Sequence, residues 1–245
     1  MKSSTTHLSS LRALVTGATG GIGRAIVSSL VDSGIKVIAA GQNTEKLAGI
    51  AEEHPGVATM AANLRNGAAV VELANDSLKQ FGGIDILINN AGIGVSGNVV
   101  DLEIDDYEAM LAVNLRAPFI LSKIIGKSMA EAGFGYIINI GSGASYTPIA
   151  GMASYCATKY GLLGFSESLA LELREQGVKV TIITPGSTAS GFGGGESSKK
   201  LANKPGILLP EDIADTVMYI LNQSGRAWTS QVNLRPLNPN KRPKY

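Results

Sequence analysis

One glycine-rich stretch decides how this chain is organised: Thr16-Gly17-Ala18-Thr19-Gly20-Gly21-Ile22-Gly23. It follows an apolar run typical of a buried strand and precedes a segment with helical spacing. Glycines between a strand and a helix let the backbone approach a pyrophosphate, whose charge the helix N-terminus attracts. The same glycines also serve tight packing of a helix on a strand, so the stretch alone leaves both interpretations open.

Apolar, β-branched runs recur along the chain and alternate with segments of helical spacing. We expect strands at 11–16, 37–40, 57–61, 84–88, 136–140 and 178–184. We expect helices at 22–31, 45–52, 68–81, 106–130 with a break near Asn114, 155–174, and a last one starting at Pro210. Asp105 and Glu108 have the spacing of a capping box. The alternation predicts an α/β fold with a doubly wound parallel sheet, covered by helices on both faces.

The chain is expected to form a single domain, 1–245, because one α/β domain of this length is ordinary. Residues 1–9 are expected to be a flexible N-terminus and residues 237–245 a C-terminal tail. Residues 187–209 break the rhythm of strands and helices with a cluster of glycines and polar residues. We interpret this segment as a mobile lid over the substrate.

The composition argues against several classes of partner and site. The net charge is +1 with Lys and Arg scattered, so no basic stripe suits nucleic acid or a membrane surface. No apolar run approaches the length of a membrane span, and a cytoplasmic location is the expectation. Cys156, His7 and His54 are too few and too dispersed for a metal site.

Several notable segments fall where an expected strand ends. They are Asn89-Asn90-Ala91-Gly92, Ser142 and Pro185-Gly186. Open α/β sheets bind ligands along this carboxyl edge. The segments therefore predict a binding site there, together with the glycine-rich stretch.

Tyr155 and Lys159 lie four residues apart, on one face of an expected helix. A tyrosine with a pKa of about 10 needs its phenolate stabilised by about two units, roughly 3 kcal/mol, to exchange protons at neutral pH. A cation about 4 Å away supplies roughly 4 kcal/mol at an effective dielectric of about 20. The pair therefore suits acid–base chemistry. The alternative is an interface aromatic beside a solvated charge.

Together these segments resemble the short-chain dehydrogenase/reductase family over roughly residues 10–235. Residues 16–23 resemble its Thr-Gly-x-x-x-Gly-x-Gly turn, and residues 89–92 its Asn-Asn-Ala-Gly segment. Asn114, Ser142, Tyr155 and Lys159 fall where the catalytic residues of the family belong. The resemblance implies a Rossmann fold and hydride transfer between NAD(P) and a carbonyl or alcohol carbon.

The resemblance also implies a role for each residue. Tyr155 would exchange a proton with the substrate oxygen, which Ser142 would also bind. Lys159 would hold the nicotinamide ribose and lower the pKa of Tyr155, and Asn114 would fix a water. The cofactor contacts expected are Gly17, Thr19, Gly21, Ile22, Gly23, Gln42, Asn43, Asn63, Leu64, Asn90, Ala91, Gly92, Tyr155, Lys159, Pro185, Gly186 and Thr188. The expected substrate pocket is Gly94, Ala144, Ile149, Met152 and Phe192.

The end of the second strand bears on the choice of cofactor. It reads Ala40-Gly41-Gln42-Asn43 and offers no carboxylate to repel a 2′-phosphate. With Arg24 and Asn43 nearby, NADP is favoured and NAD stays possible. Asn63 stands where the family often has an aspartate facing the adenine amine, and its amide oxygen can accept the same bond.

The substrate expected is a small to medium ketone, with a 3-oxoacyl thioester as the runner-up. Basic residues that would meet the acidic surface of an acyl carrier protein are missing at 131–133 and 169–171, and only Lys127 keeps the positive charge. The family usually assembles through helices near 115–130 and 155–174, so a homotetramer, or a homodimer, is expected. A non-catalytic NADP(H)-binding regulator is the alternative of another class.

Overall fold

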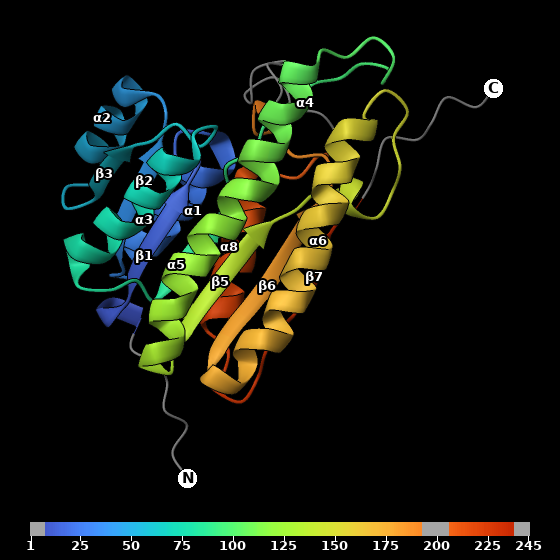
Figure 1. Cartoon of the computed structure of the whole chain (residues 1–245). Helices are drawn as coiled ribbons and strands as arrows, with labels where there is room; N and C mark the ends of the chain where they lie inside the picture. The colour runs from blue at the N-terminus through green and yellow to red at the C-terminus, as the bar shows by residue number, and fades with distance from the viewer. Residues whose placement is uncertain (1–7, 193–205, 238–245) are drawn as a thin grey trace.

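The computed structural model describes residues 8–192 and 206–237 (Figure 1). In these ranges the strands form one seven-stranded sheet of order β3-β2-β1-β4-β5-β6-β7, and every neighbouring pair is parallel. The strands are β1 (Arg12–Thr16), β2 (Lys36–Gly41), β3 (Ala58–Ala61), β4 (Ile86–Asn89), β5 (Gly135–Ile140), β6 (Val178–Pro185) and β7 (Gln231–Leu234). This is the doubly wound fold predicted from the alternation of strands and helices.

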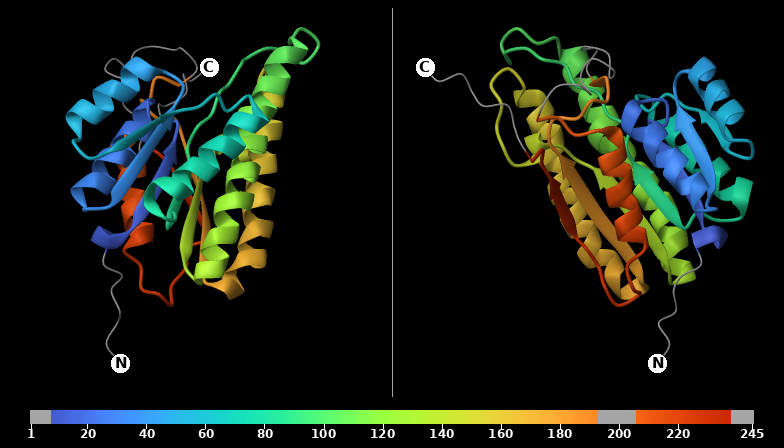
Figure 2. Two further views of the ribbon diagram at one scale, coloured as in Figure 1. Left: turned by 60° about the vertical axis from the view of Figure 1, so that its left-hand side comes forward. Right: turned by 180° about the vertical axis from the view of Figure 1, so that it is seen from behind.

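Helices cover both faces of the sheet. The helices are α1 (Gly21–Asp32), α2 (Thr44–Glu53), α3 (Gly67–Phe81), α4 (Ile104–Leu111), α5 (Ala117–Ala132), α6 (Ala153–Leu173) and α8 (Pro210–Leu221). Short helical turns are η1 (Leu8–Ser10), η2 (Ala112–Arg116), η3 (Gly143–Ser145) and η4 (Arg174–Gln176). Helices α5 and α6 lie in front of β5 and β6 in Figure 1, whereas α1 and α8 lie in front when the molecule is seen from behind in Figure 2.

The alternation of side chains along each strand builds two separate cores. In β1, Ala13 and Val15 join the core beneath α1, α2 and α8, whereas Leu14 joins the core beneath α3, α5 and α6. In β4, Ile86 and Ile88 face the first core and Leu87 the second. Because both faces are covered, the central strands are apolar at nearly every position, and this produces the continuous runs seen in the sequence.

The predicted strands and helices begin and end within two residues of the observed ones, with three corrections. Helix α4 starts at Ile104 with Glu103 as its N-cap, so Asp105 lies inside the first turn and the predicted capping box is wrong. The helix does not break near Asn114, because residues 112–116 continue it as a π-helix. The short edge strand β7 was not predicted.

The stretch Ile104–Ala132 is long and apolar enough to cross a membrane by length and composition, contrary to the sequence reading. Most of its apolar window is buried inside the protein. Leu121, Ile125 and Met129 of α5 pack in the core against the sheet. Packing against the sheet therefore accounts for the apolar composition of this stretch.

The structure describes only part of the predicted terminal segments and lid. Leu8 and Ser9 of the expected flexible N-terminus belong to η1. Residues 1–7, residues 193–205 of the expected lid and residues 238–245 of the expected tail lie outside the described ranges. Of the rest of the lid, Thr188 forms a parallel bridge with Leu208, which closes the two ends of the segment together.

Candidate active site

A cavity of about 960 Å³ lies along the carboxyl ends of the parallel strands. This is near the upper end of the usual volume of ligand pockets, about 300–1,000 Å³. Its walls come from loops after β1, β2, β3, β4, β5 and β6, and from α6. The lining residues are Gly17, Thr19, Gly20, Gly21, Ile22, Gly23, Ala40, Gly41, Gln42, Ala62, Asn63, Leu64, Arg65, Asn90, Ala91, Gly92, Ile93, Val113, Ile140, Gly141, Ser142, Gly143, Ala144, Thr147, Ile149, Met152, Tyr155, Lys159, Pro185, Gly186, Ser187, Thr188, Ser190, Gly191, Phe192, Ile207 and Arg235.

The glycine-rich turn is tied to the loop that follows β4. The Asn90 side-chain amide donates to the carbonyl oxygens of Thr16 at 3.0 Å and Gly17 at 3.1 Å. Gly17 has a φ of +63°, and a Cβ on it would lie 2.7 Å from the Cα of Ala91. Only glycine therefore fits between the two loops at this position.

Glycines also allow close contacts along the cavity wall, at the start of α1 and at the end of β2. A Cβ on Gly21 would lie 2.9 Å from the backbone oxygen of Ser190, and one on Gly41 would lie 2.8 Å from the Cγ2 of Thr19. The bare turn leads into the N-terminus of α1, where unpaired backbone N–H groups favour an anion. These residues fit a dinucleotide, whose pyrophosphate the turn and the N-terminus of α1 would bind.

Tyr155 and Lys159 come from the first turns of α6, and their side chains are 7% and 4% exposed. The Nζ of Lys159 lies 5.8 Å from the centre of the Tyr155 ring and donates to the carbonyl oxygen of Ile140 at 3.0 Å. Ser142 lies at the end of β5 as the N-cap of η3, with its Oγ accepting from the N–H of Ala144. The sheet edge and α6 thus bring a hydroxyl, a phenol and an ammonium to one wall of the cavity.

Burial shifts both titratable groups of this wall towards their neutral forms. It raises the pKa of Tyr155, while the Ser142 hydroxyl lowers this pKa by hydrogen bonding and Cys156 raises it. Burial lowers the pKa of Lys159 to about 8. Within the chain itself, burial therefore outweighs the lowering of the Tyr155 pKa that acid–base chemistry near pH 7 requires.

Asn114 lies behind the cavity wall and is fully buried in the π-helical segment. Its Oδ1 accepts from the N–H of Ile93 at 2.9 Å, and its Nδ2 donates to the Ile93 carbonyl at 2.9 Å and to Thr158 Oγ1 at 3.0 Å. Both amide donors are therefore used, and one lone pair remains on Oδ1. The side chain holds the loop after β4 against α6.

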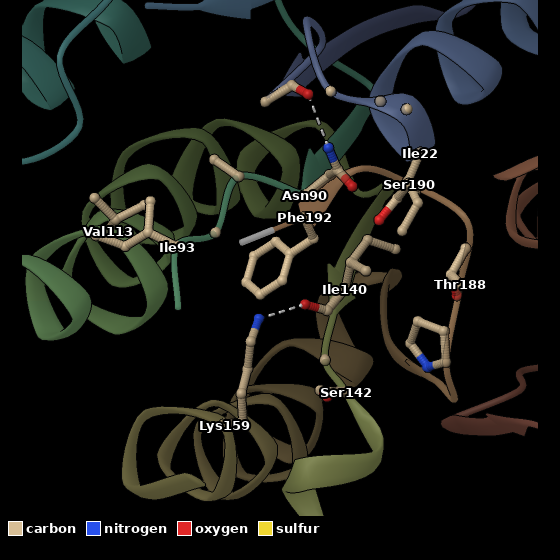
Figure 3. Close-up of a pocket in the computed structure, with 18 of the residues that line it drawn as sticks. Ile22, Asn90, Ile93, Val113, Ile140, Ser142, Lys159, Thr188, Ser190 and Phe192 are labelled. Atoms are coloured by element: carbon tan, nitrogen blue, oxygen red, sulfur yellow. Dashed lines mark hydrogen bonds between the residues drawn. The ribbon is translucent and has the colours of Figure 1, made fainter. Parts of the chain in front are cut away.

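The aromatic ring of Phe192 lies in the middle of the cavity, beside Lys159 in Figure 3. Its centre is 5.8 Å from that of Tyr155. A Cβ on Gly94 would lie 2.9 Å from its Cε1, and a Cβ on Gly92 would lie 3.7 Å from its Cε2. The described part of the expected lid thus packs directly on the proposed catalytic tyrosine.

Most residues predicted for the site line this cavity. The cofactor residues all do so except Asn43, whose side chain instead caps α2 by accepting from the N–H of Lys46. The predicted substrate residues do so except Gly94, which packs against Phe192. The Asn63 side-chain oxygen, expected to face the adenine, accepts from the N–H of Arg65.

One cation lies away from the place expected for it, and two cations of the cavity were not predicted. Arg24 forms an ion pair with Glu53 at 2.5 Å and does not line the cavity. Arg65 and Arg235 do line it, after β3 and β7 respectively. Arg65 lies four residues after the end of β3, a strand that was predicted, so its position at the sheet edge was a signal in the sequence. Arg235 follows the strand that was not predicted. Over 8–192 and 206–237, no group of three or more His, Cys, Asp or Glu side chains is placed to hold a metal ion.

Several known proteins are similar to this chain over most of its length. The short chain dehydrogenase family matches residues 12–200. An uncharacterised oxidoreductase of Staphylococcus aureus (strain MW2) is 34% identical over 229 residues, covering 92% of this chain and 96% of the relative. D-threitol dehydrogenase of Mycolicibacterium smegmatis is 34% identical over 227 residues, covering 86% of each.

Solved structures show the same likeness. A metagenomic short-chain oxidoreductase in complex with NADP superimposes with a TM-score of 0.82 at 34% identity, covering 94% of this chain and 99% of the other. Similarity at this level shows the same fold over nearly the whole chain.

Proposed function

The chain belongs to the short chain dehydrogenase family and is an NAD(P)-dependent oxidoreductase, and on that premise we propose that it reduces a small to medium ketone with NADPH. One observation carries this proposal. Tyr155, Lys159 and Ser142 share one wall of the cavity that the glycine-rich turn also lines. The proposed catalytic residues are Asn114, Ser142, Tyr155 and Lys159.

In the proposed reaction the bound nicotinamide supplies the hydride, and the chain positions the carbonyl and supplies the proton. The Ser142 hydroxyl and the Tyr155 hydroxyl hydrogen-bond the carbonyl oxygen, and Tyr155 gives its proton to that oxygen. Lys159 binds the nicotinamide ribose, and its ammonium stabilises the phenolate that remains on Tyr155. Burial of both groups keeps bulk water away from this proton.

Asn114 is proposed to help return a proton to Tyr155 by holding a water. The free lone pair on its Oδ1 is the acceptor that its side chain has left for this water. Its other bonds fix the loop after β4 and Thr158 of α6 in place. Asn114 therefore acts in part by positioning the wall from which Tyr155 and Lys159 project.

NADP, rather than NAD, is the proposed cofactor, supported by charge at the adenosine end of the cavity. Gln42 offers no carboxylate there, and Arg65 adds a cation at the end of β3, the strand next to β2. We expect Arg65→Met to weaken NADPH binding and leave NADH binding unchanged, measured by fluorescence titration. An equal effect on both cofactors would argue against a role in recognising the 2′-phosphate.

The proposed reaction is tested by following NADPH and NADH consumption in parallel by purified protein. The carbonyl panel contains diketones, 3-oxo esters, 3-oxoacyl thioesters, cyclic ketones and quinones. We expect NADPH to be consumed with a small ketone preferred. Preference for the thioesters would favour 3-oxoacyl reduction, and consumption of NADH alone would contradict the proposed cofactor.

The catalytic assignment is tested by Tyr155→Phe, which removes only the proton donor. We expect turnover to be abolished while NADPH binding survives. Tyr160→Phe is the matched control, because Tyr160 lies on the same helix, is 43% exposed and does not line the cavity. Turnover that persists in Tyr155→Phe would refute the assignment.

A homotetramer or homodimer is proposed as the assembly. Large apolar side chains on α5 and α6 face solvent in the single chain, among them Phe119 at 50% and Leu171 at 60% exposure. Association through these helices would cover them. Sedimentation of the purified protein as a monomer at micromolar concentration would contradict this proposal.

A further inference from the structure

Arg235, which follows the edge strand β7, lies at the rim of the cavity. Arg235 directly follows Leu234, the last residue of β7, and lines the cavity. Its Nη1 lies 2.7 Å from the position that a Cβ on Gly143 would take, and its Cδ lies 3.7 Å from the corresponding position on Gly186. The guanidinium therefore fills the space that a side chain at residue 143 would need.

This location is beside the proposed reaction centre and far from the adenosine end. Gly143 directly follows Ser142, and neighbouring Cα atoms are roughly 3.8 Å apart. The strands β7 and β3 lie at opposite edges of the sheet, so Arg235 and Arg65 serve opposite ends of the cavity. A group bound by Arg235 would therefore belong to a molecule that also reaches Ser142.

No acidic side chain lines the described part of the cavity opposite Arg235. The cationic lining residues are Arg65, Lys159 and Arg235, and none of the described lining residues is Asp or Glu. Lys159 donates to the Ile140 carbonyl and is assigned to the nicotinamide ribose. Arg65 lies next to Asn63 at the other end. Arg235 is thus the cation that the proposed cofactor contacts do not use.

Within the part of the chain that the structure describes, the guanidinium of Arg235 is also unpaired. It makes no hydrogen bond or ion pair with any residue in the ranges 8–192 and 206–237. Arg235 also lines a second, smaller hollow together with Asp212 and Asp215 of α8, and neither carboxylate forms an ion pair with it. Its N–H donors are available in the planar fork that matches a carboxylate.

We propose that Arg235 binds a carboxylate of the substrate, so that the enzyme acts on small oxo acids and the corresponding hydroxy acids. This inference rests on the proposed carbonyl reduction. The ketone oxygen would face Ser142 and Tyr155, and the carboxylate, a few carbon atoms away, would accept a pair of hydrogen bonds from Arg235. The residue would set specificity and take no part in the proton transfer.

The test compares two substrates that differ in one charge, 3-oxobutanoate and its methyl ester, in the wild type and in Arg235→Met. Methionine keeps much of the length of the side chain and removes its donors. We expect kcat/KM for the acid to fall about 10- to 100-fold, the factor that charge-assisted hydrogen bonds contribute. The value for the ester should be unchanged, and Arg235→Lys should restore part of the loss.

Arg226→Met is the matched control, because Arg226 is exposed before β7 and does not line the cavity. It should leave both substrates unaffected. Equal losses for acid and ester in Arg235→Met, or a weaker affinity for NADPH, would overturn the inference, the latter by placing Arg235 on the cofactor. A wild type that prefers the ester would also overturn it, while the proposed carbonyl reduction would stand.

Binding alone separates the two proposals if no carbonyl compound is reduced. The protein loaded with NADP⁺ cannot reduce 3-oxobutanoate, so calorimetric titration reports binding without turnover. We expect the wild type to bind the acid more tightly than the ester, and Arg235→Met to lose this difference. Equal affinities in the wild type would overturn the carboxylate site, whereas absence of turnover by itself would count only against carbonyl reduction.

Discussion

Replacing Lys159 with methionine should stabilise the folded protein while it removes activity. The ammonium is 4% exposed, and burial lowers its pKa from 10.5 to about 8. A shift of this size means that keeping Lys159 charged lowers the free energy of unfolding by about 3 kcal/mol. The variant also loses the hydrogen bond to the Ile140 carbonyl, which offsets about 1 kcal/mol of the gain. We therefore expect Lys159→Met to be more stable by about 2 kcal/mol at pH 7.

The effect has a direction with pH that distinguishes it from a packing effect. Stability rises with pH wherever the unfolded state binds more protons than the folded state. Between pH 8 and pH 10.5 the unfolded lysine holds a proton that the folded one has released. The wild type should therefore gain stability over this interval, and the advantage of Lys159→Met should be full below pH 8 and vanish as the pH approaches 10.5.

Urea denaturation followed by circular dichroism, without cofactor, measures this difference at pH 7 and near pH 10. Turnover in the same preparations should fall about 100-fold or more, as for the loss of a group that supports proton transfer. Lys123→Met is the control, since Lys123 is an exposed lysine of α5. A variant that is less stable than the wild type at pH 7, with a difference that does not change with pH, would refute the reasoning.

Three further predictions concern other parts of the site and the fold. Asn114→Ala removes a buried side chain with three hydrogen bonds and should cost about 2–4 kcal/mol of stability in urea, whereas the exposed Asn98→Ala should cost little. Gly17→Ala, at a φ of +63° and against Ala91, should weaken NADPH binding at least about tenfold, whereas Gly49→Ala, which meets open space, should not; equal affinities would contradict the close fit. Arg12→Met breaks an ion pair with Asp85 at 2.7 Å and should cost about 1–2 kcal/mol in thermal unfolding without changing turnover; altered kinetics would contradict a purely structural role.

The fold could be predicted from the sequence because the sheet is covered on both faces. The residues of β1, β4 and β5 are buried at nearly every position and most are apolar, and glycines mark several of the connections. The strand β7 escaped prediction because it lies at the edge of the sheet, where Gln231–Leu234 alternates between exposed and half-buried residues instead of forming an apolar run. Arg235 was missed for the same reason.

The site could be predicted only as far as local motifs reach. Tyr155 and Lys159 share a helical face by spacing alone, so their placement followed from the sequence. The partners of Asn114 did not, because Ile93 and Thr158 are 21 and 44 residues away along the chain. The same holds for Arg24, whose pairing with Glu53 across 29 residues withdraws it from the role expected for it. Contacts of this kind depend on how the helices and strands pack, which no periodicity in the sequence records.

The π-helical segment at residues 112–116 changes the direction in which the side chains after it point around the helix. Because of this one wide turn, α4 and α5 form one continuous helix, but their buried faces point in different directions around its axis. Deleting one residue from this segment would return the helix to regular winding and rotate everything beyond it by roughly 100°. Either Asn114 or the apolar stripe of α5 would then point the wrong way. The extra residue interrupts the regular α-helix, and it allows one helix both to place Asn114 behind the cavity wall and to pack α5 against the core.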